Sequence, residues 1–371
     1  MNFDFSDEEK RVQRAARELL EKSSPLSHVR QILDARSAYD TELWSVLAEM
    51  GWMGVAVASE HGGIDSGYLE LALIAEELGR SLAAVPFSSS VYLAAEALKL
   101  AGSADQRALL LPGVVSGKRI GALAAFERLG QIGFEDTRTK LEHGRIHGTK
   151  VPVVDGPVAD FAIVLATMGR AGPTLALVDL TGGDVRSEAL QSFDPLRPLG
   201  RLVFDGAKAE PLGEPGRGLE ILAALFDRAA VLIAFEQLGG AQRCLETARD
   251  YTLGRYAFGR PVASFQAIKH KLADMYAAIE LARSNCYFGV WALSSGSAEL
   301  PLAACLARVS ATEAFEMCAR ESLQAHGGVG FTWEFDCHLF VRRSALLSLM
   351  LGPVGIWKDR LVGHLERQAS A

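Results

Sequence analysis

Two arginines flank a short loop between two long helical patterns. Arg255 and Arg260 belong to the segment Arg-Tyr-Ala-Phe-Gly-Arg-Pro, and Ser-Phe-Gln follows, ending at Gln266. A guanidinium group forms bidentate hydrogen bonds with phosphate oxygens, so the segment could place two arginines in a phosphate site. The alternative is a plain helix terminator, in which Gly259 and Pro261 end the helix and the arginines face the negative end of its dipole.

A second segment, Gln324–Phe331, carries three glycines in four residues after another helical pattern. Glycines at Gly327 and Gly328 let the backbone approach a ligand closely, and their N–H groups can donate to an anion. The same glycines could simply cap the helix. The segment does not follow a strand, so it is not a dinucleotide-binding fingerprint. His326 has no acid or cysteine partner at a set spacing, which favours a structural histidine.

The elements that must position these segments fall into three zones. Residues 1–115 have helical periodicity, with a capping box at Ser6 and Glu9 and helices expected over Thr41–Met50 and Tyr68–Leu78. Gly79 is expected to end the last of these helices.

The middle zone, residues 116–212, consists of short β-type runs separated by glycine and proline. Such spacing predicts a small antiparallel barrel or sandwich. The expected strands are Arg119–Ala125, Arg145–Gly148, Phe161–Ala166, Thr174–Val178 and Arg201–Phe204.

The last zone, residues 213–371, returns to long helices with wide apolar faces, which predicts a four-helix bundle. The fold class is therefore α+β, with helical, β and helical domains in that order. The expected helices are Gly218–Leu253, Ser264–Ser294, Glu299–Ala325 and Asp336–Met350, with one more near the C-terminus.

Composition excludes several function classes. The net charge is −7 and no basic stripe is present, which argues against nucleic-acid binding. The five cysteines form no CxxC pair, so we expect reduced, buried thiols and no metal site. The charged N-terminus is unlike a signal peptide, and no run of about 18 apolar residues predicts a membrane span. A cytoplasmic oligomer is the expectation.

Three segments, taken in order, resemble the acyl-CoA dehydrogenase family. Gly51–Gly79 is similar to its GW, ExGG and EELG patterns. Arg255–Gln266 is similar to its RxxFG and FQ patterns, and Gln324–Gly330 to its QxxGGxG pattern. The resemblance covers nearly the whole chain. It implies the same three-domain fold and the α,β-dehydrogenation of an acyl-CoA thioester, in fatty-acid or steroid side-chain oxidation.

The resemblance also implies a cofactor and partners. FAD would be held partly across a subunit interface in a homo- or hetero-tetramer, and an electron-transfer flavoprotein would accept the electrons. The FAD-binding residues implied by the matching positions are Arg255, Phe258, Gln266, Gln324, Gly327 and Gly328.

The chain departs from the family where the catalytic glutamate is expected. One family position for this base, 24 residues after the first glycine of GGxG, is Leu351, and the alternative position early in the long helix is Ala229. Neither side chain can accept a proton. Glu236 lies seven residues beyond Ala229, about 10 Å along the helix axis. It could act as a base with a raised pKa, or be a buried acid paired with Arg243 or with an arginine from another helix.

The middle zone departs as well. Ala124–Gly130 replaces the family's Thr-Glu-Pro and Gly-Ser-Asp segment, and Lys150–Val154 replaces its Trp-Ile-Thr segment. These losses resemble the smaller chain of two-subunit dehydrogenases that act on sterol or bile-acid side chains, in which the other chain supplies the base. A self-sufficient enzyme that uses Glu236, a non-catalytic CoA- or flavin-binding scaffold, and a relative with oxygenase-type flavin chemistry are the alternatives.

Overall fold

A computed structural model describes residues 7–369, so the predicted cap at Ser6 lies outside the described part. The chain packs into two compact units. The first holds the residues up to Arg30, Tyr68–Ala83 and the residues from Ala230 on, and the second holds Gln31–Gly67 and Ala84–Ala229. The predicted domain boundaries at residues 115 and 212 stay predictions.

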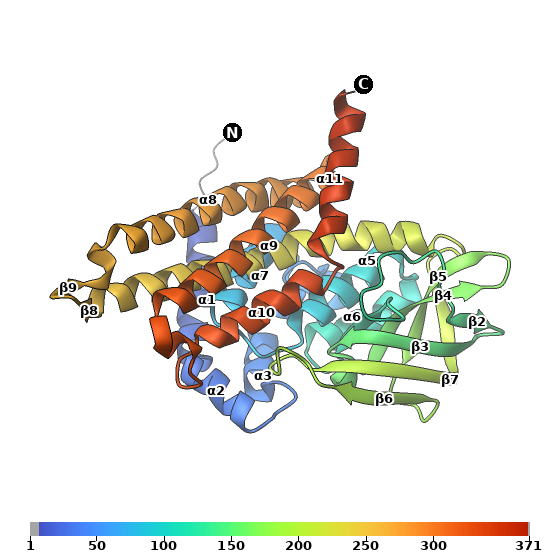
Figure 1. The fold of residues 1–371 in the computed structure, drawn as a ribbon. Helices are drawn as coiled ribbons and strands as arrows, with labels where there is room; N and C mark the ends of the chain where they lie inside the picture. The colour runs from blue at the N-terminus through green and yellow to red at the C-terminus, as the bar shows by residue number, and fades with distance from the viewer. Residues whose placement is uncertain (1–6, 370–371) are drawn as a thin grey trace. The chain divides into compact units, whose positions relative to one another are not determined.

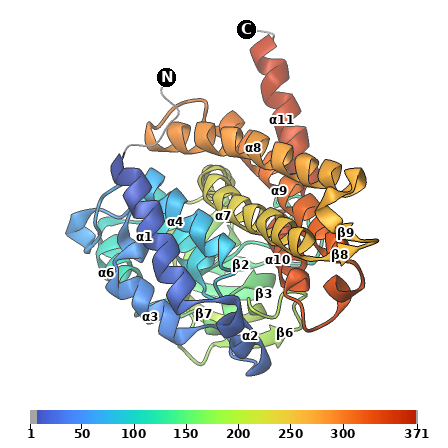
Figure 2. The ribbon, with the colours of Figure 1, turned by 90° about the vertical axis from the view of Figure 1, so that its left-hand side faces the viewer.

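The first unit is built from long helices (Figures 1 and 2). All the long helices expected in the last zone are confirmed within one or two residues at each end. Its helices are α1 (Asp7–Ser23), α4 (Tyr68–Arg80), α8 (Gln266–Ser294), α9 (Leu300–Ala325), α10 (Cys337–Leu349) and α11 (Val354–Ala369), with most of α7 (Gly218–Gly254) and the start of α2 (Leu26–Asp34).

Small residues let these helices approach closely. On α9, Ala303, Ala307 and Ala311 recur every four residues and are fully buried. Residues four apart share a helix face, so alanines form a flat stripe along α9. Helices α8 and α9 pack side by side, and α10 and α11 also pack on α9.

Helix α4 crosses α7 through two glycines. A Cβ atom on Gly79 would lie 1.8 Å from the carbonyl oxygen of Glu236, and one on Gly239 would lie 1.7 Å from that of Glu76. Only glycine fits at either position, because no side-chain carbon comes that close to a backbone oxygen. The expectation that Gly79 ends its helix is wrong: α4 continues to Arg80, and the glycine serves the crossing instead.

Two acids beside this crossing tie α4 to other helices. Glu76 accepts hydrogen bonds from Arg283 of α8 at 2.8 Å and from Gln13 of α1 at 3.2 Å. The carboxylate of Glu77 accepts a bidentate pair of hydrogen bonds from the guanidinium of Arg17 of α1, at 3.0 and 2.7 Å. Both carboxylates are buried, and burial raises the pKa of Glu77 although Arg17 opposes that effect. The Glu-Glu-Leu-Gly pattern therefore has a packing role.

The second unit contains a seven-stranded sheet (Figure 1). The strand order β4-β2-β3-β7-β5 closes on itself through a β4–β5 pairing, which confirms the barrel-like prediction. The pairing is not purely antiparallel as expected, because β4 runs parallel to both β1 and β2. The strands are β1 (Gly121–Ala124), β2 (Lys140–Glu142), β3 (Arg145–Val154), β4 (Phe161–Met168), β5 (Gly172–Asp179), β6 (Val185–Leu190) and β7 (Leu199–Leu212).

Alternate residues of each strand fill the barrel interior. Ala162, Val164 and Ala166 of β4 are buried together with Leu202 and Phe204 of β7. This period of two is what places one face of a strand inside. All five predicted strands are confirmed, whereas β2 and β6 were missed because both are short and carry charged residues at exposed positions.

Four helical segments in the second unit complete the N-terminal zone. They are α3 (Thr41–Glu49), α5 (Glu96–Ala101), α6 (Ala104–Val115) and a buried π-helix over Ser88–Ala95. The π-helix carries Ser88, which accepts from Arg197 at 2.8 Å, and Arg197 is also paired with buried Asp155. This network fixes the π-helix against the barrel.

Across residues 7–369, no single helix is long and apolar enough to cross a membrane. Helices α10 and α11, bent by 49° at their junction, would pass that test only when taken together.

The glycine crossing gives a first prediction. Replacing Gly239 by alanine forces α7 away from α4 and should lower the free energy of unfolding by about 3 kcal/mol or more. Gly355 on α11 is the matched control, since a Cβ there meets nothing within 4 Å. Its alanine variant should change stability by under about 1 kcal/mol. Urea denaturation compares the two, and equal stabilities would contradict the close-crossing account.

Candidate functional site

The predicted phosphate segment forms a tight hairpin after α7. Strands β8 (Tyr256–Ala257) and β9 (Arg260–Pro261) pair, and the turn between them is made by Phe258 and Gly259 at positive φ values of 51° and 76°. The side chain of Phe258 is 95% exposed. Positive φ at both central residues is what a tight two-residue hairpin turn of this kind requires, and the exposed ring makes Phe258 a candidate contact residue.

The two arginines of this segment have different surroundings. Arg260 lies over the ring of Phe265, 4.0 Å from its centroid. Arg255 is exposed, and among residues 7–369 no carboxylate pairs with it. Arg255 is thus the guanidinium available to a phosphate, whereas Arg260 supports the hairpin through a cation–π contact.

The glycine-rich segment leaves open space over its backbone. Gly327 has φ 63°, and a Cβ atom on Gly327 or Gly328 would meet nothing within 4 Å. A Cβ on Gly330 would instead lie 2.3 Å from the carbonyl oxygen of Leu323. Gly330 is therefore required by internal packing. Packing does not require a glycine at position 328, so the lack of a side chain there leaves room for a ligand to approach the backbone.

The β8–β9 hairpin joins α7 to α8 at one end of these long helices (Figure 1). The six candidate cofactor-binding residues lie in or next to this hairpin or at the C-terminal end of α9, and all six are exposed. Tyr251, one turn before Arg255, stacks on His326 with ring centroids 4.2 Å apart, so the end of α7 lies against the end of α9. Lys271 of α8 pairs with Glu321 of α9. Two segments that are distant in sequence therefore converge, and together they form one candidate binding surface: Arg255, Phe258, Gln266, Gln324, Gly327 and Gly328.

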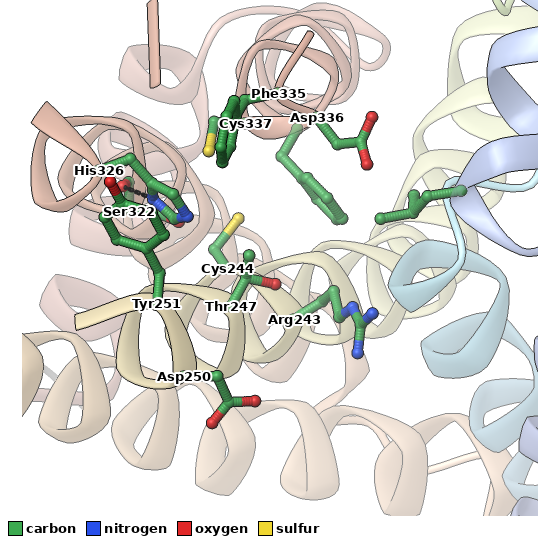
Figure 3. Close-up of a pocket in the computed structure, with 12 residues that line it drawn as sticks. Arg243, Cys244, Thr247, Asp250, Tyr251, Ser322, His326, Phe335, Asp336 and Cys337 are labelled. Atoms are coloured by element: carbon green, nitrogen blue, oxygen red, sulfur yellow. Dashed lines mark hydrogen bonds between the residues drawn. The ribbon is translucent and has the colours of Figure 1, made fainter. Parts of the chain in front are cut away.

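A cavity of about 380 Å³ lies behind this surface (Figure 3). His326 forms one wall; it is buried, and its Nδ1 lies 2.7 Å from the carbonyl oxygen of Ser322, in keeping with a structural histidine. Cys244 and Cys337 also line the cavity. Burial raises the pKa of the Cys337 thiol to about 11 and that of Cys244 well above its ordinary value. Neither is a nucleophile at neutral pH.

All five cysteines are buried, as the sequence predicted, and no disulfide forms among residues 7–369. Among residues 7–369, no group of three or more His, Cys, Asp or Glu side chains could hold a metal ion.

Two family models match the chain. The model of the acyl-CoA dehydrogenase N-terminal domain matches residues 6–118, and that of the acyl-CoA dehydrogenase C-terminal domain matches residues 216–364. The chain belongs to the acyl-CoA dehydrogenase family.

Individual relatives cover almost the full length. Acyl-CoA dehydrogenase IpdE2 of Mycobacterium tuberculosis is 31% identical over 340 residues, 91% of each chain. The solved structure of the steroid ACAD Tcur3481-Tcur3483 is 30% identical with a TM-score of 0.88, covering 98% of this chain and 99% of that one. The ChsE4-ChsE5 complex from Mycobacterium tuberculosis is 27% identical with a TM-score of 0.89, covering 99% of each chain.

The two positions at which the resemblance implies the base, Leu351 and Ala229, carry no acid. Leu351 is buried in the turn between α10 and α11, where its carbonyl accepts from the indole N–H of Trp357 at 3.2 Å. Ala229 is fully buried in α7. Both positions are packed with hydrocarbon side chains, which cannot take up a proton.

Glu236 is the acid that sequence reasoning singled out in their place. It is 3% exposed, and an oxygen of its carboxylate lies 3.7 Å from Nη1 of Arg343 on α10. Arg343 also donates to the carbonyl oxygen of Ala83 at 3.3 Å. The alternative of a paired acid is thus what the geometry favours, with the partner on another helix. Arg243 lies near Glu246 instead.

The β domain holds a charged pair that the sequence did not single out. The carboxylate of Glu127 accepts from the backbone N–H groups of Arg138 and Thr139 at 2.9 and 2.8 Å and from Nζ of Lys150 at 2.9 Å. Lys150 is fully buried and also donates to the carbonyl oxygen of Ala125 at 3.1 Å. The visible signal was a lysine directly before the apolar run Val151–Val154.

The pKa values of Glu127 and Lys150 both differ from their ordinary values. Burial raises the pKa of Glu127, but the backbone N–H groups and Lys150 outweigh it and hold the value at about 2. Burial lowers the pKa of Lys150 to about 8, and Glu127 opposes that change. Both groups are therefore charged at neutral pH. A polar cavity of about 530 Å³ borders Glu127; its walls also include Arg128, Gln131 and Thr149.

The Glu127–Lys150 pair gives a pH prediction. A carboxyl whose folded pKa lies below its ordinary value of 4.5 contributes stability above that value and loses it as pH falls towards about 2. Removing the partner of a buried lysine costs about 3 kcal/mol at pH 7. Glu127→Gln should therefore be destabilised at pH 7 and should lose the acid-dependent part of the unfolding free energy, about 2 kcal/mol after solvent screening.

The control for that prediction is Glu135→Gln, an exposed acid on the same loop. It should keep the wild-type stability profile when chemical denaturation is followed between pH 7 and pH 2.5. Parallel profiles for the two variants would show that Glu127 does not carry this ion pair.

Proposed function

We propose that this chain is one subunit of an FAD-dependent acyl-CoA dehydrogenase that forms the α,β double bond of an acyl-CoA thioester. In this proposal the partner subunit supplies the catalytic glutamate. The observation that carries it is a contrast: the surface built from Arg255, Gln324 and Gly328 is open to a ligand, yet both base positions hold hydrocarbon side chains.

Relatives support the heteromeric part of the proposal. The ChsE4-ChsE5 structure is a complex of two differently named chains, and the steroid ACAD Tcur3481-Tcur3483 also carries two chain names. A chain 30% identical to that steroid enzyme over nearly its whole length fits the same arrangement, with a bulky sterol-derived acyl group as substrate.

The reaction needs a base at the α carbon and a hydride acceptor at the β carbon. When bound, FAD supplies the acceptor for the hydride. The open backbone at Gly327 and Gly328 and the unpaired guanidinium of Arg255 fit its diphosphate, because N–H groups and arginine are the donors that phosphates prefer. The exposed ring of Phe258 fits a contact with a flat group or with another subunit.

The α proton has no acceptor at Leu351 or Ala229, so its acceptor must come from elsewhere. A carboxylate of the partner subunit satisfies this need without any change in this chain. The role left to this chain is to hold the cofactor's phosphates and to keep water away with its packed interior. An electron-transfer flavoprotein as acceptor, a tetrameric assembly and a cytoplasmic location complete the proposal.

A self-sufficient enzyme is the second candidate, with Glu236 as base. Its burial favours this role, and its ion pair with Arg343 opposes it, since a paired carboxylate is a weaker base. A flavin- or CoA-binding scaffold and an oxygenase-type relative are the remaining alternatives, and the same experiment separates them.

The deciding experiment is an anaerobic titration with acyl-CoA thioesters, including a sterol side-chain thioester, followed by the visible absorption of the flavin. The chain purified alone should not bleach, whereas the chain co-purified with a related subunit that carries the glutamate should bleach. Bleaching by the isolated chain that Glu236→Gln abolishes would establish the self-sufficient alternative. A colourless complex would indicate a scaffold.

The cofactor site has its own prediction. Arg255→Gln should lose bound FAD from the assembled complex, with an affinity decrease of about tenfold or more, because a charge-assisted bond to phosphate is lost. Arg249→Gln is the control, since Arg249 lies on α7, which ends one residue before Arg255, and its ion-pair partner among residues 7–369 is its exposed neighbour Asp250 at 2.8 Å. Flavin fluorescence after ultrafiltration measures both. Equal retention by the two variants would remove Arg255 from the site.

A further inference from the structure

The cavity of about 380 Å³ in the helical unit has no role in the proposed reaction (Figure 3). Its walls come from α7, from the end of α9 and from the start of α10, and they include Leu26 of α2. The base position Leu351 instead follows the far end of α10. Small-molecule sites range from about 300 to 1,000 Å³, so the volume of this cavity suits a small ligand.

One wall of the cavity carries a hydrogen-bond acceptor that the chain leaves unused. The Nδ1 atom of His326 lies 2.7 Å from the carbonyl oxygen of Ser322. A carbonyl oxygen only accepts, so Nδ1 carries the proton, and Nε2 of the neutral ring keeps its lone pair. Among residues 7–369 no group bonds to Nε2, although the side chain is 4% exposed. A buried acceptor of this kind calls for a donor.

Aromatic rings hold the imidazole in this orientation. Tyr251 stacks on His326 with ring centroids 4.2 Å apart. Phe335 meets both rings at steep angles, with centroids 5.9 Å from His326 and 6.1 Å from Tyr251. Phe335 and Phe340 also line the cavity. Walls of this kind favour a flat, apolar body with a few polar groups at its ends.

Each acid that lines the cavity has an arginine of its own. Asp336 pairs with Arg30. Asp250 pairs with its neighbour Arg249 at 2.8 Å. Because both carboxylates already have a cation beside them, the cavity does not call for a cationic ligand.

Arg243, which also lines the cavity, is paired only loosely. Its ion-pair partner among residues 7–369 is Glu246, one turn further along α7, at 4.0 Å. The carboxylate of Glu246 accepts much closer bonds from Arg80 at 2.5 Å and from Gln242 at 3.0 Å. The side chain of Arg243 is 38% exposed, so its guanidinium is accessible. It is the group of the cavity wall that suits a carboxylate.

We propose that this cavity binds a small aromatic carboxylic acid that carries a hydroxyl group on its ring. Figure 3 shows His326 and Arg243 on opposite sides of the cavity, with Cys244 and Thr247 between them, so one polar group at each end of the ligand fits. The carboxylate pairs with Arg243, and the hydroxyl donates to Nε2 of His326. Water in the cavity would satisfy Nε2 but would leave the apolar wall wet. The site does not depend on the proposed dehydrogenase activity.

Calorimetric titration of the purified protein in its native assembly tests the contacts with matched ligands, at pH 8, where an imidazole is ordinarily neutral. 4-Hydroxybenzoate should bind about fivefold more tightly than benzoate or 4-methoxybenzoate, because it alone donates a hydrogen bond from the ring. Arg243→Gln should weaken 4-hydroxybenzoate binding about tenfold. Arg320→Gln, which changes an exposed arginine of α9, should leave it unchanged. No binding, or equal affinities for the three ligands, would overturn the proposal.

A second variant assigns the hydroxyl contact. His326→Phe keeps a ring against Tyr251 and removes the acceptor, so it should abolish the preference for 4-hydroxybenzoate and leave benzoate binding unchanged. A preference that survives in the folded variant would refute the assignment.

A crystal structure of the wild-type protein with 4-hydroxybenzoate decides the question if His326→Phe does not fold. The ligand should lie within hydrogen-bonding distance of Nε2 of His326 and of the Arg243 guanidinium. Ligand density elsewhere, or only ordered water in the cavity, would refute the proposal. No flavin or thioester enters these measurements, so their failure leaves the dehydrogenase proposal unaffected.

Discussion

The backbones of α4 and α7 are in direct contact at Gly79 and Gly239, and this contact constrains the packing of the helical unit. Each glycine lies against a backbone oxygen of the other helix, at distances that exclude any side chain. The crossing sets the position of Glu76 and Glu77, whose partners lie on α1 and α8. The crossing also fixes where Glu236 lies along the axis of α7 relative to the neighbouring helices. This position determines which residue of α10 can contact the Glu236 carboxylate. The packing of α1, α8 and α10 against α4 and α7 therefore depends on this contact.

Periodicity predicted the elements well, because long apolar faces and alternating strands are local signals. It failed where a residue's role depends on a distant segment. Gly79 has the sequence context of a helix end but serves a helix crossing, and nothing nearby in the sequence distinguishes the two. Lys150 was read only as part of a replaced strand, although Glu127, 23 residues earlier, holds it in place. Strands β2 and β6 were missed because their pairing partners, rather than their own residues, make them strands.

The candidate site was found through resemblance, and the structure adds the reasons that sequence could not give. A Cβ atom would meet open space at Gly327 and Gly328 but a carbonyl oxygen at Gly330, so three neighbouring glycines have two different surroundings. The guanidinium of Arg255 pairs with no carboxylate among residues 7–369, whereas that of Arg260 lies over the ring of Phe265. An ion pair of Glu236 with an arginine from another helix was one of the predicted alternatives, but the identity of that arginine could not be predicted, since Arg343 lies more than a hundred residues further along the chain.

The exposed ring of Phe258 at the hairpin tip has a consequence for the turnover of the chain in the cell. A nearly bare aromatic ring at the point of a tight turn is the kind of feature that chaperones and proteases recognise on an incomplete assembly. If the proposed partner subunit covers this tip, a copy made in excess of it would keep the ring in water and be removed, whereas an assembled copy would hide it. The abundance of this chain would then follow the supply of its partner, through turnover and without any change in transcription.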